Sequence, residues 1–328
     1  MSKKLENKKY FILSGFFIWS VSIIFALLNG SGFYGFGIDY YGAYIKGFEW
    51  SIARATFFNY FSYWIATLTI NNFYIGVYLV ALVLSLSTGF LIRSYLKLKQ
   101  IHSLFFFLII FIIAIHTWPI IMSSSNAMRQ GLAMSFMFLS LISTIQKNYY
   151  YLIIFSFISI LSHLSGLFFT TLIFIAIITY EMFKNFSGTS KIFINLIIGI
   201  SLFITSYYLL KFFFLDENFK PSRIIAGDFR AHFVLIAFIY IFFSFFFKSM
   251  MASPSNLFLY YFSFVSVAFL IVGLNWQFER LWMMVLIPYI MFFGTFLDNI
   301  SYKMYLISIF ILLFFLTIYT GMYSIGLT

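Results

Sequence analysis

Cysteine is absent from this sequence, and so are several motifs typical of soluble enzymes. Without cysteine the chain has no disulfide bonds, no thiolate metal ligands and no cysteine nucleophile. It also has no phosphate-binding loop, no dinucleotide-binding fingerprint, no HExxH motif and no acidic DxD motif. These absences argue against a metal-dependent nucleotide-sugar transferase, and we expect neither a metal nor a cofactor.

Charged residues are scarce as well. They make up 9% of the chain, whereas 63% of the residues are hydrophobic, and soluble globular proteins carry about 25% charged residues. Apolar stretches of roughly 18 or more residues recur along the whole length, and each can cross a hydrocarbon core of about 30 Å. Such repeated stretches also exclude a lone signal peptide. The composition therefore predicts a membrane protein.

The net charge of +11 does not indicate nucleic-acid binding, because the lysines lie mostly in short connectors between apolar segments. Lysine-rich connectors are typical of the cytoplasmic side of a membrane protein. The start of the chain, MSKKLENKKY, has this character. We expect a cytoplasmic N-terminus, surrounding membrane lipids and no nucleic-acid partner.

Hydropathy predicts an all-α, polytopic integral membrane protein with about eleven transmembrane helices. The connectors 29–72 and 214–230 are predicted to be long extracytoplasmic loops. We find no soluble domain and no tandem repeat, so the chain 1–328 is expected to form one membrane domain. The segments lie at about 10–28, 73–92, 102–121, 127–146, 149–163, 166–181, 192–213, 231–247, 256–274, 281–297 and 303–321.

The stretch 149–180 has two interpretations, one long tilted helix or two short spans. The sequence SHLSG at Ser162–Gly166 is polar and contains glycine, which favours two spans. With two spans, most arginines face outward and nearly all cytoplasmic cations are lysines. Arginine is preferred where phosphate is bound, because its planar fork binds two oxygens at once. The outward arginines are then Arg54, Arg129, Arg223, Arg230 and Arg280.

The stretch SSSNAMRQGLAMSF places Arg129 at the start of an otherwise apolar segment. Asn126 is a good N-cap residue, which would make Arg129 the third residue of the helix. The free N–H groups of a first turn, the helix dipole and a nearby guanidinium together favour an anion. Small residues at Gly131, Ala133 and Ser135 permit close helix packing. The alternative is an arginine that only extends to the membrane interface.

His163 lies within the polar sequence SHLSG, between apolar stretches. Polar residues at membrane depth are costly and usually functional. Imidazole accepts a proton near neutral pH, so His163 is a candidate base towards a sugar hydroxyl. The structural alternative is a hydrogen bond between helices. The other histidines lie singly near segment ends and are interpreted as structural: His102, His116 and His232.

The outward connectors combine carboxylates, aromatic rings and arginines. Carboxylates accept hydrogen bonds from sugar hydroxyls, and aromatic rings stack on the apolar faces of sugars. Each connector taken alone is also compatible with a simple solvated loop. The candidate residues are Asp39, Tyr40, Tyr44 and Glu49 in the first loop, Arg223 and Arg230 in the second, and Trp276 and Arg280 near the last outward turn.

Residues 126–175 resemble the EpsG-like branch of the Wzy-type bacterial polysaccharide polymerases. In that family an Arg-Gln pair opens a helix, a lysine-containing turn follows, and a second helix ends in a His-x-Ser motif. The corresponding residues here are Arg129, Gln130, Lys147, His163 and Ser165. An outer-loop Gly-x-Asp with a following tyrosine, at Gly37, Asp39 and Tyr44, and an arginine opening a late span, Arg280, are also similar. The chain departs from the family in lacking an arginine shortly before Asp39 and a glutamate near the start of the second span.

The resemblance implies a membrane glycosyltransferase similar to the GT-C type, with its active site on outward-facing loops. It would join oligosaccharide repeat units, carried on undecaprenyl pyrophosphate, on the outer face of the bacterial cytoplasmic membrane. A chain-length regulator is a plausible partner in such a system. Positive groups can stabilise a pyrophosphate leaving group without a metal. Rival interpretations are a flippase or exporter of the same lipid-linked sugar and a membrane O-acyltransferase.

The implied roles divide the candidate residues into three groups. Proton transfer falls to His163 first, with Asp39 or Glu49 as the second choice. Pyrophosphate binding falls to Arg129, helped by Arg280 and by Arg223 or Arg230. Contacts with the sugars fall to Gln130, Ser165, Tyr40, Tyr44 and Trp276.

Overall fold

In the computed structural model of the chain, helices account for all regular structure within the described residues. These residues are 3–35, 73–125, 127–214, 231–246, 251, 253–293 and 306–315. They form two compact units, of which unit 1 comprises Met1–Thr170 and Ile300–Thr328, and unit 2 comprises Thr171–Asn299. The predicted division into one membrane domain and two long loops stays a prediction.

The helices of unit 1 are α1 (Lys3–Gly30), α4 (Phe73–Leu98), α5 (Leu104–Ile115), α6 (Trp118–Ser125), α7 (Met128–Ile145), α8 (Tyr149–Ser162) and the unlabelled helix Leu306–Phe315. Helix α9 (Leu164–Phe183) begins in unit 1 and continues into unit 2. The other helices of unit 2 are α10 (Gly188–Phe214), α11 (Ala231–Phe246), α12 (Pro254–Ile271) and α13 (Asn275–Phe293).

Long apolar helices confirm the prediction of an all-α, multi-pass membrane protein. Six helices in the described ranges are long and apolar enough to cross a membrane, and a bent pair raises the number to as many as seven. Three shorter apolar helices, which include α8, have 10–17 residues. The count of about eleven spans, the kind of membrane and the side of the N-terminus therefore stay predictions.

The predicted hydrophobic segment 102–121 consists of two helices and not of one. Helices α5 and α6 are bent by 54° at a break that contains His116 and Thr117. Pro119 supplies the reason, because its ring would clash with the Ile115 carbonyl if α5 continued. The Thr117 hydroxyl donates to the Ala114 carbonyl (2.6 Å) at the end of α5. The serines of the predicted SSSN connector are the last residues of α6.

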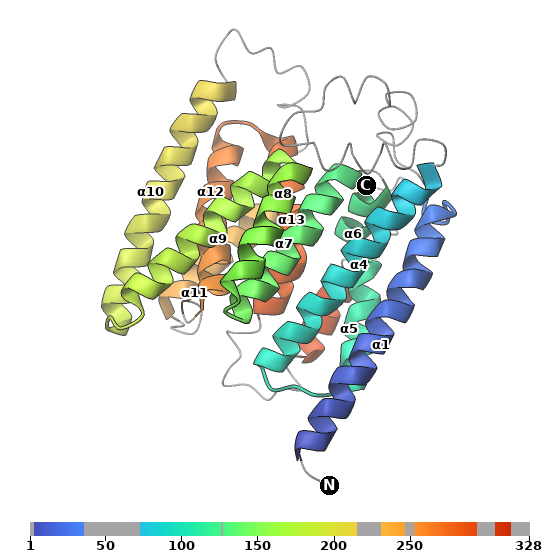
Figure 1. Cartoon of the computed structure of the whole chain (residues 1–328). Coiled ribbons are helices and arrows are strands. Elements are labelled where there is room, and N and C mark those ends of the chain that lie inside the picture. Colours follow the sequence, from blue (N-terminus) through green and yellow to red (C-terminus); the bar gives the residue numbers. More distant parts are fainter. Residues whose placement is uncertain are drawn as a thin grey trace. The chain divides into compact units, whose positions relative to one another are not determined.

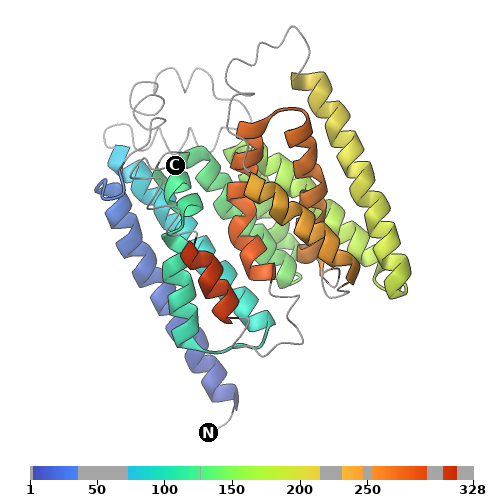
Figure 2. The same cartoon turned by 180° about the vertical axis from the view of Figure 1, so that it is seen from behind.

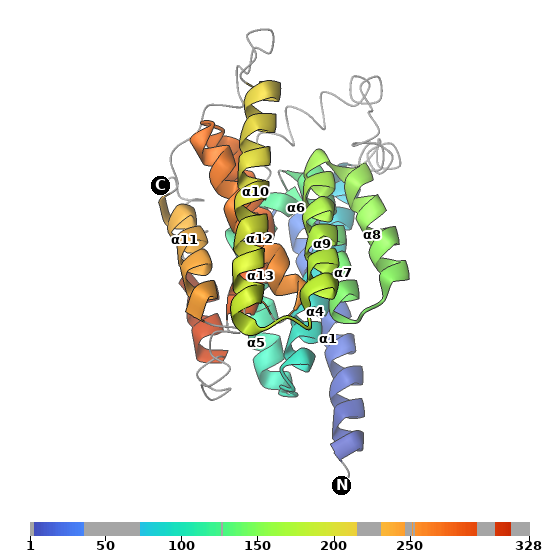
Figure 3. The same cartoon turned by 90° about the vertical axis from the view of Figure 1, so that its left-hand side faces the viewer.

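The stretch 149–180 forms two helices, as the two-span interpretation predicts. Helices α8 and α9 are separated by the single residue His163, whose backbone is extended (φ −166°, ψ 149°). Figure 3 shows α8 and α9 meeting at this break. Of the two, α9 is long enough to span a membrane, whereas α8 has 14 residues.

Helix α7 lies at the centre of unit 1 and packs against α4, α6 and α8, while α4 packs along α1 (Figure 1). A short turn joins α7 to α8, with Lys147 in the left-handed region (φ 56°) and the Asn148 N–H donating to the Ser143 carbonyl (2.9 Å). The turn makes α8 antiparallel to α7. The hydroxyls of Ser140 and Ser156 meet across this pair (3.3 Å).

Helix α12 has the corresponding position in unit 2, where it packs against α10, α11 and α13. The buried Tyr261 hydroxyl on α12 donates to Asn195 Oδ1 on α10 (2.5 Å). Gly273, with φ 84°, makes the tight turn between α12 and α13 (Figure 2). Because α13 begins at Asn275, the predicted start of this segment at residue 281 is wrong by about two helical turns.

Candidate functional site

The first part of the candidate site is the junction between α6 and α7. Its N-cap residue is Ala127, which has no side-chain capping bond, so the prediction of Asn126 as N-cap is wrong. The Ala127 N–H donates to the Met122 carbonyl (2.9 Å), so the closing turn of α6 extends to Ala127 and α7 starts one residue later than predicted. Arg129 is therefore the second residue of α7, and it is partly buried.

The backbone of α7 approaches α6 very closely at Gly131. A Cβ atom at this position would lie 2.1 Å from the Ser123 carbonyl oxygen, so only glycine fits without a backbone shift. The Gly131 N–H donates to the Ala127 carbonyl (2.9 Å) within the helical ladder. The N–H groups that precede it in the first turn lie outside this ladder and close to the guanidinium-bearing residue Arg129. The predicted close packing at the small residues of α7 is confirmed.

The second part of the site is the break between α8 and α9. His163 Nδ1 accepts hydrogen bonds from the Ser165 N–H (3.2 Å) and the Ser165 hydroxyl (2.8 Å). A backbone N–H can only donate, so Nδ1 carries no proton in this bond and the neutral ring has its proton on Nε2. His163 therefore caps the first turn of α9, and its ring proton lies on Nε2.

Gly166 holds this break tightly. Its N–H donates to the His163 carbonyl (2.8 Å), and a Cβ atom at Gly166 would lie 2.1 Å from the Ser159 carbonyl oxygen. The same Ser159 carbonyl accepts the His163 N–H (3.3 Å). All these contacts join residues within seven positions of one another, so the sequence SHLSG itself builds the break.

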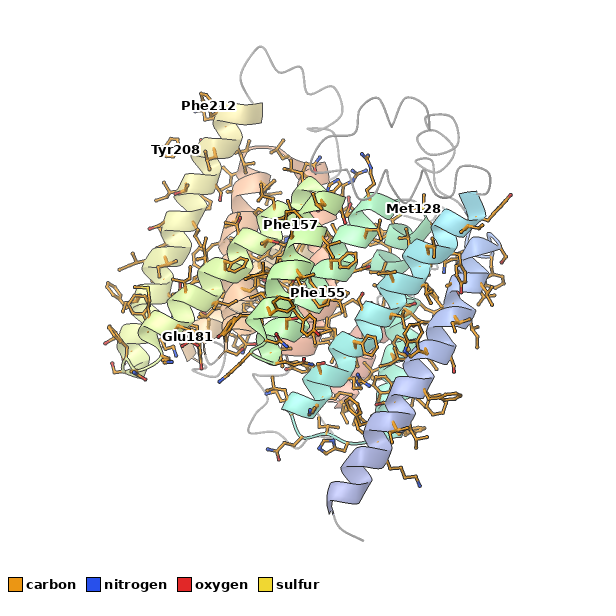
Figure 4. The ribbon with its side chains drawn as sticks, viewed as in Figure 1. Met128, Phe155, Phe157, Glu181, Tyr208 and Phe212 are labelled. Carbon is orange, nitrogen blue, oxygen red and sulfur yellow. The ribbon has the colours of Figure 1, made fainter. Side chains whose placement is uncertain are left out.

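The register of α7 and α8 brings the two parts of the site to one end of unit 1. The Ser159 hydroxyl on α8 donates to the Ala133 carbonyl on α7 (2.9 Å). Arg129 precedes Ala133 by four residues, and His163 follows Ser159 by four residues. Because the helices are antiparallel, both steps run in the same direction from this hydrogen bond. Figure 4 likewise shows Met128 and Phe157 towards the same end. The structure therefore places the Arg-Gln pair and the His-x-Ser motif at the same level.

The end of α1 also reaches this part of the molecule. Asn29 is buried, its amide group donates to the Phe25 carbonyl (2.9 Å), and its Oδ1 accepts a hydrogen bond from the Ser124 hydroxyl on α6 (2.8 Å). Ser124 follows Ser123, whose carbonyl packs against Gly131. The start of the predicted first loop is thus connected to the helix that carries Arg129.

Sequence reasoning missed one pair, Tyr34 and His116. Tyr34 Oη lies 2.8 Å from His116 Nε2, and His116 Nδ1 lies 2.7 Å from the Ile112 carbonyl oxygen. A carbonyl can only accept, so Nδ1 carries the proton and Nε2 of the neutral ring accepts from the Tyr34 phenol. Burial raises the pKa of Tyr34, which keeps the phenol protonated as a donor. The two residues are 82 positions apart, so hydropathy and local motifs give no signal for this contact.

The remaining predicted site residues belong to unit 2 or lie outside the described residues. Arg280 is the sixth residue of α13 in unit 2, so it does not open the helix, and it follows the buried Glu279. Trp276 is in the first turn of α13, but its side chain lies outside the described residues. Within the described ranges, no group of His, Asp and Glu has a geometry that could hold a metal ion. The other predicted residues lie outside the described ranges: Asp39, Tyr40, Tyr44, Glu49, Arg223 and Arg230.

The fold and the site together define a class, a multi-pass helical membrane protein with an arginine and two histidines at helix starts and breaks. Comparison of the chain with protein-family models, with curated proteins and with solved structures gives no match. The resemblance to the Wzy-type polymerases therefore rests on the short motifs at 126–175.

Proposed function

We propose that this protein is a polysaccharide polymerase that joins lipid-linked oligosaccharide repeat units. Its donor is the growing chain on a polyprenyl pyrophosphate, and its acceptor is a sugar hydroxyl of an incoming repeat unit. The observation that carries the proposal is the common level of Arg129 and His163 at one end of the α7–α8 pair. These residues belong to the two motifs, Arg-Gln and His-x-Ser, on which the resemblance depends.

Arg129 supports the proposal because the reaction releases a pyrophosphate. The developing negative charge needs positive groups that are already oriented, and Arg129 stands beside the N–H groups of the first turn of α7. A guanidinium binds two phosphate oxygens at once, which an ammonium group does not. The arrangement serves a pyrophosphate leaving group without a metal ion.

His163 supports the proposal in a role of positioning. With Nδ1 engaged by Ser165, the neutral ring carries its proton on Nε2, and in this proposal Nε2–H donates to a phosphate oxygen or a sugar oxygen of the substrate. Gln130, which is buried, follows Arg129 in the sequence, and Ser165 lies two residues after His163. The roles predicted for Asp39, Glu49, Arg223, Arg230 and Arg280 stay predictions, as do those of Tyr40, Tyr44 and Trp276.

The reaction belongs on the outer face of the bacterial cytoplasmic membrane in this proposal. The N-terminus is cytoplasmic, about eleven segments cross the membrane, and both helix breaks of the site face outward. The substrate's lipid carrier, undecaprenyl pyrophosphate, remains in the bilayer, and a chain-length regulator stays a predicted partner.

Polymer length tests the proposal directly. Substitution Arg129→Ala should leave only single repeat units on the lipid carrier, and Arg129→Lys should give short chains because lysine keeps the charge without the fork. Extracted polysaccharide is separated on gels, with protein amounts checked in the membrane. The matched control is Arg93→Lys. Arg93 lies 4.4 Å from the Phe11 ring centre and 4.9 Å from that of Phe90, in α4 of the same unit.

Polymer of normal length from the Arg129→Ala strain, at ordinary protein levels, would contradict the proposal.

The side of the membrane on which repeat units accumulate separates the rival classes. Repeat units that face the cytoplasm in a strain without the protein indicate a flippase, whereas units on the outer face indicate a polymerase. A loss of acetate from a polymer of normal length indicates an O-acyltransferase.

A further inference from the structure

The two histidines of unit 1 that stand at helix breaks present opposite groups at Nε2. His163 presents a donor, because its Nδ1 accepts from the Ser165 N–H. His116 presents an acceptor, because its Nδ1–H donates to the Ile112 carbonyl (2.7 Å). A general base needs an available lone pair on a group that can hold a proton. Of the two rings, His116 has that arrangement.

We propose that Tyr34 and His116 form the proton relay of the polymerisation reaction, in which Tyr34 takes the proton of the acceptor hydroxyl and His116 takes the phenolic proton of Tyr34. This inference rests on the proposed function and assigns its proton acceptor to a residue outside the family motifs. It gives the base role to His116 and leaves His163 to hold substrate oxygens.

The atoms and electrons of the step balance. The acceptor hydroxyl oxygen forms a bond to the anomeric carbon of the growing chain and transfers its proton to Tyr34 Oη. Tyr34 gives its own proton to His116 Nε2, so the phenol is restored and the imidazole becomes an imidazolium. The bond between the anomeric carbon and the pyrophosphate oxygen breaks, and its electron pair leaves with the pyrophosphate. The imidazolium later loses its proton to water.

Contacts around the pair fix it in the orientation that the relay needs. The Ile112 carbonyl holds the Nδ1 proton and stabilises the imidazolium, because its negative end points at the charged ring. The Phe25 ring contacts both residues edge-on or tilted, with ring centres 5.8 Å from Tyr34 and 5.9 Å from His116. Both side chains are only partly buried, and in the proposed relay a substrate hydroxyl meets the Tyr34 oxygen.

The Tyr34–His116 pair is connected through α6 to α7, the helix that carries Arg129. Asn29, one turn after Phe25 on α1, accepts a hydrogen bond from Ser124 of α6 (2.8 Å), and α6 begins directly after the break at His116. The neighbouring carbonyl, that of Ser123, packs against Gly131 of α7. The proposed proton acceptor, His116, therefore lies just before α6, and the proposed pyrophosphate site at Arg129 lies just after it. Helix α6 carries no titratable side chain, and Tyr34 is the titratable group that contacts His116 among the described residues.

The test measures polymerisation by the purified full-length protein in lipid bilayers. Its substrate is the lipid-linked single repeat unit extracted from a strain that lacks the protein. The initial rate is followed against substrate concentration for the wild type, His116→Gln, His116→Ala, Tyr34→Phe and the matched control His102→Gln. His102 precedes the other end of α5 and contacts Tyr10. Tyr34→Phe keeps the ring and removes only the hydroxyl, so it tests the relay even where His116→Gln folds poorly.

His116→Gln should lower kcat by roughly 10²–10⁴-fold, with KM unchanged. Tyr34→Phe should lower kcat by about 10²-fold or more, and His102→Gln should behave as the wild type. Added imidazole should restore part of the rate of His116→Ala, which a purely structural role does not explain.

Three results would overturn the inference. The first is a wild-type kcat in both His116→Gln and Tyr34→Phe. The second is a loss of rate that follows the loss of folded protein in thermal melts, which would make the pair a structural clamp. Both leave the proposed function intact, because the wild type still makes polymer. The third is a wild type that makes no polymer from the lipid-linked unit, which overturns the proposed function together with the relay.

Discussion

The break at His116 and the break at His163 use the same side chain in opposite ways. At His116 the ring nitrogen nearest the backbone, Nδ1, donates to the Ile112 carbonyl (2.7 Å), and at His163 it accepts from the Ser165 N–H (3.2 Å). One neighbouring backbone group therefore decides where the ring proton lies. One histidine therefore presents an acceptor at Nε2, and the other carries its proton there.

The two breaks also differ in what holds them. The break at His163 is local, because His163, Ser165, Gly166 and Ser159 make its contacts within one short stretch. The break at His116 starts from a local cause, Pro119, and is also connected to α1 and the turn that follows it. That connection is made by the hydrogen bonds Tyr34–His116 and Asn29–Ser124, whose partners are 82 and 95 positions apart. A local break survives changes elsewhere in the fold, whereas the other break is coupled to the docking of α1.

Adding a methyl group at the local break should have the largest effect on stability. In Gly166→Ala the new Cβ would lie 2.1 Å from the Ser159 carbonyl oxygen, so backbone has to move. We expect a loss of about 3 kcal/mol or more in unfolding free energy, seen as a lower melting temperature in detergent. Gly131→Ala, with the same distance to the Ser123 carbonyl, should behave alike.

The matched control for these glycines is Gly15→Ala, where the nearest atom is the flexible Arg93 side chain at 3.3 Å. Alanine favours a helix over glycine by about 1 kcal/mol, so this variant should be neutral or slightly more stable. An unchanged melting temperature in Gly166→Ala would show that the local break is not as tight as the contact at Ser159 indicates.

Removing one hydroxyl should weaken the break that depends on α1. Ser124→Ala takes away the donor to Asn29 Oδ1, and Asn29 is only 1% exposed, so a buried acceptor loses its bond from α6. We expect a loss of about 1–2 kcal/mol. Ser31→Ala is the control, because its hydroxyl bonds to the Leu28 carbonyl at the surface. Equal melting temperatures for the two variants would argue against coupling between α1 and α6.

Two substitutions at His163 should separate capping from chemistry, with the smallest effect on stability. His163→Ala loses the bond to the Ser165 N–H and should cost about 1 kcal/mol, the usual value of a helix N-cap. His163→Asn can restore the cap through its side-chain oxygen but has no group in the place of Nε2–H. We expect His163→Asn to recover the melting temperature and still give shortened polymer on gels. Recovery of both properties would reduce His163 to a capping residue.

The predicted break at SHLSG was found because its causes lie next to one another in the chain. Polar residues and a glycine interrupt an apolar run, and the contacts that they make are short-range. The bend at His116 was missed, although Pro119 was a usable signal, because hydropathy continues across it. The N-cap of α7 was wrong by one residue, since the Ala127 N–H closes the end of α6.

The sequence by itself determined that the chain is helical, that it is built for a membrane, and that Arg129 and His163 stand near helix ends. These properties follow from hydropathy and local backbone preferences. Only the tertiary structure decided the pairing of Tyr34 with His116, the docking of α1 on α6, and the common level of Arg129 and His163. The physical reason is that the contacts behind them join groups 82, 95 and 26 positions apart, which no local pattern encodes.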